Sequence, residues 1–145
     1  MELSPKVEYA LLALLELTAW YEQQIPVRIQ AIADRQQLGD RYLEQILATL
    51  RRGGLVRSQR GAKGGYLLAR DPRSVTLFDA IECMEGNSAS DAETASVQPT
   101  PSVEAVREIW QEMYRTLHKM MQKYTLQDLY ERQKAKQPQD IMYYI

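Results

Sequence analysis

The sequence predicts a mainly α-helical protein with one small β-hairpin: a winged helix-turn-helix domain followed by a long dimerisation helix. Three observations support this fold class. Two short amphipathic segments flank a turn that contains glycine, a basic glycine-rich loop separates two β-prone runs, and a heptad pattern occupies the C-terminal part. We expect a DNA-binding domain over residues 1–86, a flexible linker over 87–101, and a dimerisation helix with a tail over 102–145.

Helical spacing of apolar residues predicts the first three helices. The first is expected over 3–21, with Ser4 as N-cap, Pro5 in the first turn, and a stripe of Leu3, Val7, Leu11, Leu14, Thr18 and Tyr21. The second is expected over 28–36 and the third over 40–52, joined by the turn 37–39. Tyr42 or Leu43 begins the buried face of the third helix, and Gly53-Gly54 ends it.

The wing follows directly. Residues 55–58 and 66–69 are β-prone, and the loop 59–65 between them is rich in glycine and basic residues, which predicts a hairpin with a positively charged tip. A fourth helix is expected over 74–86, with Cys83 on its inner face. The acidic and proline-containing stretch 87–101 then reads as a linker.

Residues 102–124 carry apolar side chains at alternating spacings of three and four, which is the seam of a coiled coil. Packing against the chain's own domain would explain the same pattern, but the position after a linker favours a second copy of the chain. The expected interface residues are Val103, Val106, Trp110, Met113, Leu117, Met120 and Tyr124. The apolar end of the chain, 141–145, is expected to dock on the protein surface.

Composition limits the classes of function. The 145 residues have a net charge of −1, yet residues 28–73 carry ten Lys or Arg against four acidic residues, which is the footprint of a polyanion-binding surface. No apolar run approaches the roughly 20 residues that span a bilayer, and the N-terminus does not resemble a signal peptide. With one cysteine, a cytoplasmic protein is expected. No nucleophile–base pair, phosphate loop or metal-ligand cluster predicts an enzyme.

The third helix and the hairpin supply the groups that read DNA. Arg41, Glu44 and Gln45 lie on the face away from the apolar stripe, and these side chains match guanine, cytosine and adenine edges in the major groove. Arg51, with Arg52 and Arg57, suits phosphates. At the wing tip, Arg60 and Lys63 stand among glycines such as Gly64, which allow close approach to the backbone and entry into a minor groove.

Several segments resemble one family of bacterial regulators. Leu3-Ser4-Pro5-Lys6-Val7-Glu8-Tyr9-Ala10, Tyr42-Leu43-Glu44-Gln45-Ile46-Leu47 and Arg60-Gly61-Ala62-Lys63-Gly64-Gly65-Tyr66-Leu67-Leu68 are similar to the Rrf-two family of winged-helix regulators. The likeness covers 2–86 well and 103–130 loosely. It implies that Arg41, Tyr42 and Glu44 read bases and that Arg60 is the minor-groove residue. Gly39 stands where relatives often carry a capping serine, a loss of only a few tenths of a kcal/mol.

The same resemblance raises the question of a metal cluster. Cluster-binding relatives hold an iron–sulfur centre with three cysteines in the loop before the dimer helix, whereas residues 87–101 contain none, and Arg107 stands where some relatives place histidine. We therefore expect no iron–sulfur cluster and no other cofactor. We interpret Cys83 as either a small buried residue or a redox-sensitive thiol. Glu8 and His118 are expected to be surface or interface residues.

The expected function is a homodimeric, sequence-specific transcriptional regulator that binds a pseudo-palindromic operator in double-stranded DNA. The alternative is a regulator that uses the same fold to control a partner protein, to which the acidic stretch 74–101 and the apolar tail would be suited. The sequence leaves open the operator, the target genes, the sign of regulation, and whether the effector is a protein or a small molecule.

Overall fold

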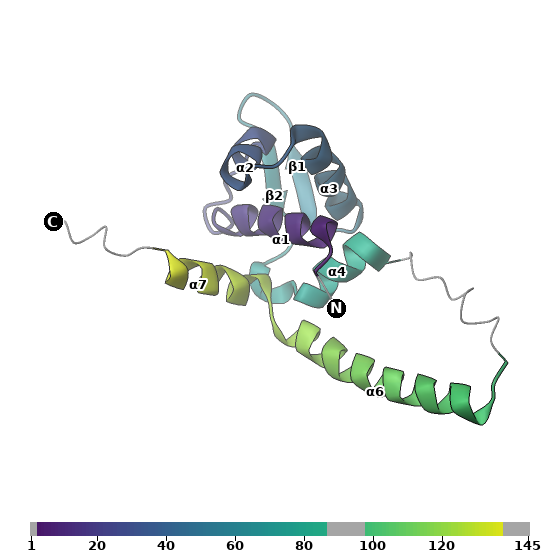
Figure 1. Cartoon of the computed structure of the whole chain (residues 1–145). Helices are drawn as coiled ribbons and strands as arrows, with labels where there is room; N and C mark the ends of the chain where they lie inside the picture. Colours follow the sequence, from purple (N-terminus) through teal and green to yellow (C-terminus); the bar gives the residue numbers. More distant parts are fainter. Residues whose placement is uncertain (1–2, 87–97, 138–145) are drawn as a thin grey trace.

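The computed structural model describes residues 3–86 and 98–137 and confirms the predicted fold class, helical with one antiparallel hairpin (Figure 1). The predicted end of the chain, 141–145, and most of the predicted linker lie outside the described residues. The elements are α1 Pro5–Thr18, α2 Ile29–Gln36, α3 Asp40–Arg52, β1 Val56–Gln59, β2 Gly65–Leu68, the 3₁₀ turn η1 Pro72–Ser74, α4 Leu77–Glu85, α6 Pro101–Lys123 and α7 Leu126–Lys136.

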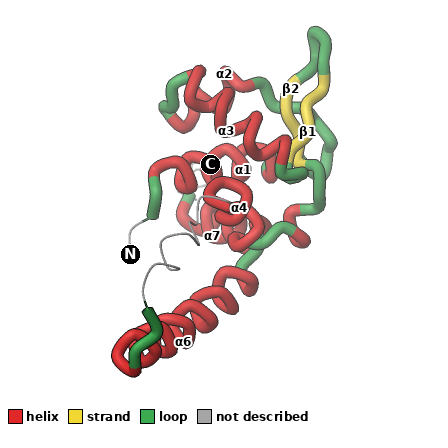
Figure 2. Tube along the Cα trace, turned by 90° about the vertical axis from the view of Figure 1, so that its right-hand side faces the viewer, coloured by secondary structure: helices red, strands yellow, loops and turns green. Residues whose placement is uncertain are grey.

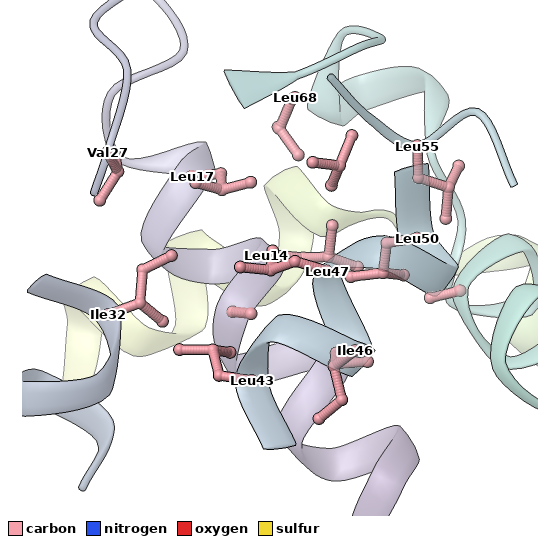
Figure 3. Packing of buried hydrophobic residues seen from close by; sticks show 14 of the residues in the cluster. Leu14, Leu17, Val27, Ile32, Leu43, Ile46, Leu47, Leu50, Leu55 and Leu68 are labelled. Carbon is pink, nitrogen blue, oxygen red and sulfur yellow. The ribbon is translucent and has the colours of Figure 1, made fainter. Parts of the chain in front are cut away.

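The core forms where α1 packs against α3 and the hairpin (Figure 3). Ala10 and Ala13 are fully buried on α1, and their small side chains allow the neighbouring helices to come close. One part of the predicted α1 stripe is wrong. Leu3 precedes the helix and is 55% exposed, and Leu17 is buried in the core instead. The helix also ends at Thr18, before the predicted Tyr21. Beyond Thr18 the amides of Trp20 and Tyr21 bond carbonyls three residues back, which makes a tighter turn than an α-helix.

A third segment joins the hairpin. Val27, just before α2, pairs with Tyr66 of β2 through two backbone hydrogen bonds of 2.9 and 2.8 Å. This pairing explains Gly65, and the hairpin loop itself explains the neighbouring Gly64. A Cβ on Gly65 would lie 2.6 Å from the Val27 carbonyl oxygen, and one on Gly64 would lie 2.1 Å from the carbonyl oxygen of Gln59. Both glycines are therefore required by the protein's own backbone.

The fourth helix begins later than predicted. Val75 is extended and Thr76 is the N-cap, so α4 covers Leu77–Glu85 rather than 74–86. The reason is a long-range contact: Thr76 forms an antiparallel bridge with Thr125, and the Leu126 amide donates to the Val75 carbonyl at 2.9 Å. Thr76 and Thr125 each begin a helix with a capping box.

The bridge brings α7 into the first domain. Leu126 is 0% exposed within the core, and α7 packs against α1 and η1. Helix α6, which precedes α7, has no buried residue. It extends away from the domain, with its C-terminal end near α4 (Figures 1 and 2). The stretch grouped in the sequence as 102–145 therefore contains one extended helix and one docked helix.

Candidate nucleic-acid interface

Helix α3 has one buried face and one polar exposed face. Leu43, Ile46, Leu47 and Leu50 are each at most 2% exposed and cover the core. Arg41, Glu44 and Gln45 are exposed on the other side of the helix. The three polar side chains predicted to contact bases therefore share one accessible face near the start of α3, where a helix entering the major groove presents its reading residues.

Tyr42 is held in place by a residue of another helix. Its ring is 38% exposed and meets the ring of Tyr9 edge to face, with centroids 5.4 Å apart and an interplanar angle of 87°. Such aromatic pairs restrict ring orientation. Leu43, not Tyr42, begins the buried face. The contribution of Tyr9 was missed, because helical periodicity within one segment does not show contacts between helices.

The tip of the hairpin presents the second group of cations. Arg60 and Lys63 are exposed, and Gly61 between them has a positive φ of 106°. The loop is closed by a hydrogen bond from the Gly64 amide to the Gly61 carbonyl at 2.9 Å. The Arg28 guanidinium donates to the carbonyl of Ala62, which ties the tip to the start of α2. In Figure 1 the hairpin tip lies at the end of the molecule opposite α6.

The arginines at the end of α3 and in β1 contact the protein itself. Arg51 donates to the Ser58 hydroxyl at 3.2 Å and so connects α3 to β1. Arg52 donates to the Thr49 hydroxyl at 3.2 Å, and Arg57 to the Gln24 side-chain oxygen at 3.1 Å. All three arginines are exposed, so their charge still contributes to a positive surface.

Two different faces run along α6. One face lies near α4, where the half-buried His118 packs on Phe78 with ring centroids 4.2 Å apart. The other face is apolar and uncovered; we call it the α6 apolar face. Its exposed large side chains are Val106 69%, Ile109 56%, Trp110 63%, Met113 54% and Met120 51%.

The predicted seam residues differ in exposure. Val106, Trp110, Met113 and Met120 are exposed, whereas Val103, Leu117 and Tyr124 are half-buried. A strict heptad reading missed Ile109, which lines a groove on the apolar face together with Met113 and Leu117. The period of 3.6 in an unsupercoiled helix brings Ile109 to the side of Met113.

Cys83 packs against the end of α3. Its thiol donates to the Thr49 carbonyl at 3.5 Å, and a Cβ on Gly53 would lie 2.2 Å from its sulfur. Burial raises the pKa of the Cys83 thiol above its ordinary value of 9.0, and the nearby positive charge of Arg52 opposes that shift. The thiol is half-buried rather than fully buried.

The donor set does not fit an iron–sulfur cluster. Such clusters are held by several thiolates. The sequence offers Cys83 alone, whose thiol donates to the Thr49 carbonyl and whose pKa is raised by burial. Within residues 3–86 and 98–137, no three His, Cys, Asp or Glu side chains come together as metal ligands.

The fold and this surface define a winged-helix protein of the DNA-binding kind. A model of the Rrf2 family, described as an iron-dependent transcriptional regulator, matches residues 3–132. The chain is 33% identical over 129 residues to the transcriptional regulator CymR of Bacillus subtilis (strain 168), covering 89% of each protein. It is also 33% identical over 132 residues to the protein rrf2 of Nitratidesulfovibrio vulgaris, covering 89% of this chain and 87% of that protein.

Solved structures agree with the sequence relatives. T. potens IscR superposes with a TM-score of 0.79 at 34% identity, covering 99% of this chain and 97% of that one. The B. subtilis CymR structure gives a TM-score of 0.75 at 32% identity, covering 91% and 98%. The chain therefore belongs to the Rrf2 family of transcriptional regulators. The family and these relatives are regulators rather than enzymes.

None of the helices in the two described stretches is long and apolar enough to cross a membrane.

Proposed function

We propose that the protein is a homodimeric transcriptional regulator that binds a pseudo-palindromic operator, with α3 in the major groove and the hairpin tip in an adjacent minor groove. The observation that carries this proposal is the exposed face of α3. Arg41, Glu44 and Gln45 are all accessible there, on a helix whose opposite face is fixed in the core. A rigidly held helix with mixed polar groups is suited to reading base edges.

Each side chain has a distinct chemical task in this arrangement. Arg41 can donate two hydrogen bonds to guanine, Gln45 can bond adenine on two atoms, and Glu44 can accept from the cytosine amino group. Tyr42, held by Tyr9, adds a contact of fixed orientation. Arg60 and Lys63 contact the minor groove and the phosphates, while Gly64 keeps the tip of the hairpin in its compact shape.

A second copy of the chain covers the α6 apolar face in this proposal. Five large apolar side chains, each at least half exposed, form that face, and covering their remaining apolar surface is favourable by roughly 25 cal/mol per Å². A two-fold dimer would set its two α3 helices roughly 34 Å apart, or a multiple of that spacing, which matches successive major grooves on one side of DNA. The operator would then be pseudo-palindromic.

In this proposal the regulator works without an iron–sulfur cluster, because one cysteine, Cys83, cannot supply the several thiolates that such a cluster needs. The proposal also places the regulator in the cytoplasm. Its signal would then come from a different source, a small molecule or a protein.

Titration of the operator selected from genomic DNA tests this function. Glu44→Ala should weaken specific binding about tenfold or more, through loss of one base contact. Arg60→Ala should weaken binding similarly and lower the slope of log affinity against log salt by about 0.9 for each lost phosphate contact. Lys119→Ala, an exposed cation on α6, is the matched control and should bind like wild type.

Wild-type affinity in both Glu44→Ala and Arg60→Ala would refute this reading mode. Selection of no specific DNA at all, together with one stoichiometric protein recovered on the intact chain, would instead favour the protein-interaction alternative.

A further inference from the structure

A groove lies between α2 and the wing, apart from the face of α3 that reads DNA in the proposed function. Its volume is about 430 Å³, which falls within the range of roughly 300–1,000 Å³ typical of sites for small organic ligands. Three segments line it: the turn after α1, one side of α2 and the tip of the hairpin. We call it the α2–wing groove.

The polar part of this groove is cationic. Arg28, Arg35 and Lys63 line it, and none of its ten lining residues is acidic. Arg28 uses its guanidinium to donate to the Ala62 carbonyl, and Arg35 contacts Glu16, outside the groove, at 3.4 Å while remaining 60% exposed. An arginine has five N–H donors, so each guanidinium keeps donors for a further acceptor. The groove is therefore complementary to an anion.

The other part of the groove is apolar. Trp20, Ile25 and Pro26 line it, and the Ile25 side chain is 45% exposed. A phosphate on a DNA backbone needs cations but no aromatic or aliphatic surface beside them. A small organic anion uses both, because its apolar body covers Trp20 and Ile25 while its charged group meets the arginines and the lysine.

We propose that the α2–wing groove binds a small organic anion: a carboxylate, phosphate or sulfonate carried on an aromatic or aliphatic body. The anionic group is bound by Arg28 and Lys63, with Arg35 at the rim. Arg28 gives the site its link to the wing, because it stands at the start of α2 and its guanidinium donates to the Ala62 carbonyl at the hairpin tip. A ligand that draws Arg28 to itself releases the hairpin tip that carries Arg60.

Fluorescence titration with 1-anilinonaphthalene-8-sulfonate tests the binding step on the full chain, without DNA. The neutral N-phenyl-1-naphthylamine, which has the same rings without the sulfonate, is the matched probe. Arg28→Gln and Lys63→Gln should each raise the dissociation constant of the sulfonate roughly tenfold and leave that of the neutral probe unchanged. Arg115→Gln with Lys119→Gln, which removes two exposed cations from α6, is the control for net charge and should bind the sulfonate like wild type.

Equal sulfonate affinity in wild type, Arg28→Gln and Lys63→Gln would overturn the proposal, as would equal affinity of wild type for the charged and neutral probes. If Arg28→Gln weakens operator binding and its salt dependence but leaves sulfonate affinity unchanged, the cations serve the DNA backbone and the proposal fails. Circular dichroism of each variant shows that it is folded.

The link to the wing has its own readout and rests on the proposed DNA-binding function. Saturating sulfonate should weaken operator binding at least fivefold in wild type. The same addition should leave the operator affinity of the Arg28→Gln variant unchanged. Unchanged operator affinity in wild type would overturn this link. Because the probe titration uses no DNA, failure of the proposed function leaves the binding result intact and is seen separately, as the absence of a specific operator.

Discussion

Helices α3 and α6 are both amphipathic, but within residues 3–86 and 98–137 only α3 has its apolar face covered. Leu43 and Leu47 of α3 are 0% exposed, whereas Trp110 and Met113 of α6 are 63% and 54% exposed. Apolar periodicity shows that a face will be buried but does not show what buries it. The comparison shows that the fold itself covers α3, and it supports the proposal that a second copy of the chain covers α6.

Alanine substitutions in the two helices should separate these sources of stability most strongly. Leu47→Ala should lower the free energy of unfolding by about 3 kcal/mol, through lost burial and a cavity. Trp110→Ala should instead weaken the proposed dimerisation, measured by sedimentation, because the Trp110 side chain is 63% exposed in the described chain. Urea unfolding at two protein concentrations distinguishes the two, since only a change in association depends on concentration.

A Trp110→Ala variant that loses as much stability as Leu47→Ala at every concentration would remove the contrast between α3 and α6. A wild-type chain that is monomeric at micromolar concentration would do the same.

A smaller effect on stability is expected from two glycines that differ in the space around them, Gly64 in the wing and Gly39 before α3. Gly64→Ala should cost about 2 kcal/mol, because the new Cβ meets the Gln59 backbone and neither atom can move without opening the loop. Gly39→Ser is the matched control. Gly39 has nothing within 4 Å of an added Cβ, and serine is the better N-cap for α3, so stability should rise by a few tenths of a kcal/mol. Thermal unfolding measures both. Equal melting temperatures for wild type and Gly64→Ala would show that the loop adapts.

These elements also show where the sequence is sufficient. The bounds of α3 were predicted correctly as 40–52, because a strong apolar stripe ends at a glycine pair whose second member, Gly54, has a positive φ of 80°. The hairpin was predicted for the same local reasons. The exposed positions of Arg41, Glu44 and Gln45 follow from the same stripe.

What the sequence did not show depends on contacts between distant segments. Tyr9 holds Tyr42, Val27 closes against the hairpin, and the start of α4 is set by Thr125. No window of neighbouring residues contains these pairs. The glycines of the wing illustrate the limit: their presence was noticed and assigned to DNA contact, while the structure adds a requirement from the protein's own backbone.

Cys83 provides the smallest expected effect, at the junction of α3 and α4. Because burial raises the pKa of its thiol, less of the reactive thiolate exists near neutral pH. Alkylation by iodoacetamide at pH 8 should be several-fold slower in the folded protein than in urea. The folded rate should rise with pH later than the unfolded rate does, because the folded pKa lies above the ordinary value of 9.0. The stability that the protonated thiol contributes should fall as the pH rises past 9.0 toward the folded pKa. A folded rate equal to the unfolded rate would contradict the packing of Cys83 on Gly53.

The bridge between Thr76 and Thr125 has a consequence for the order in which the protein is completed. Leu126 is part of the core, and its amide bonds Val75, about fifty residues earlier in the chain. Synthesis proceeds from the N-terminus, so α3 and the hairpin leave the ribosome well before the residue that closes the core beneath them. The core around α1 is therefore finished only after α6 has been made, and a chain interrupted within α6 contains α3 but lacks Leu126, which completes the domain.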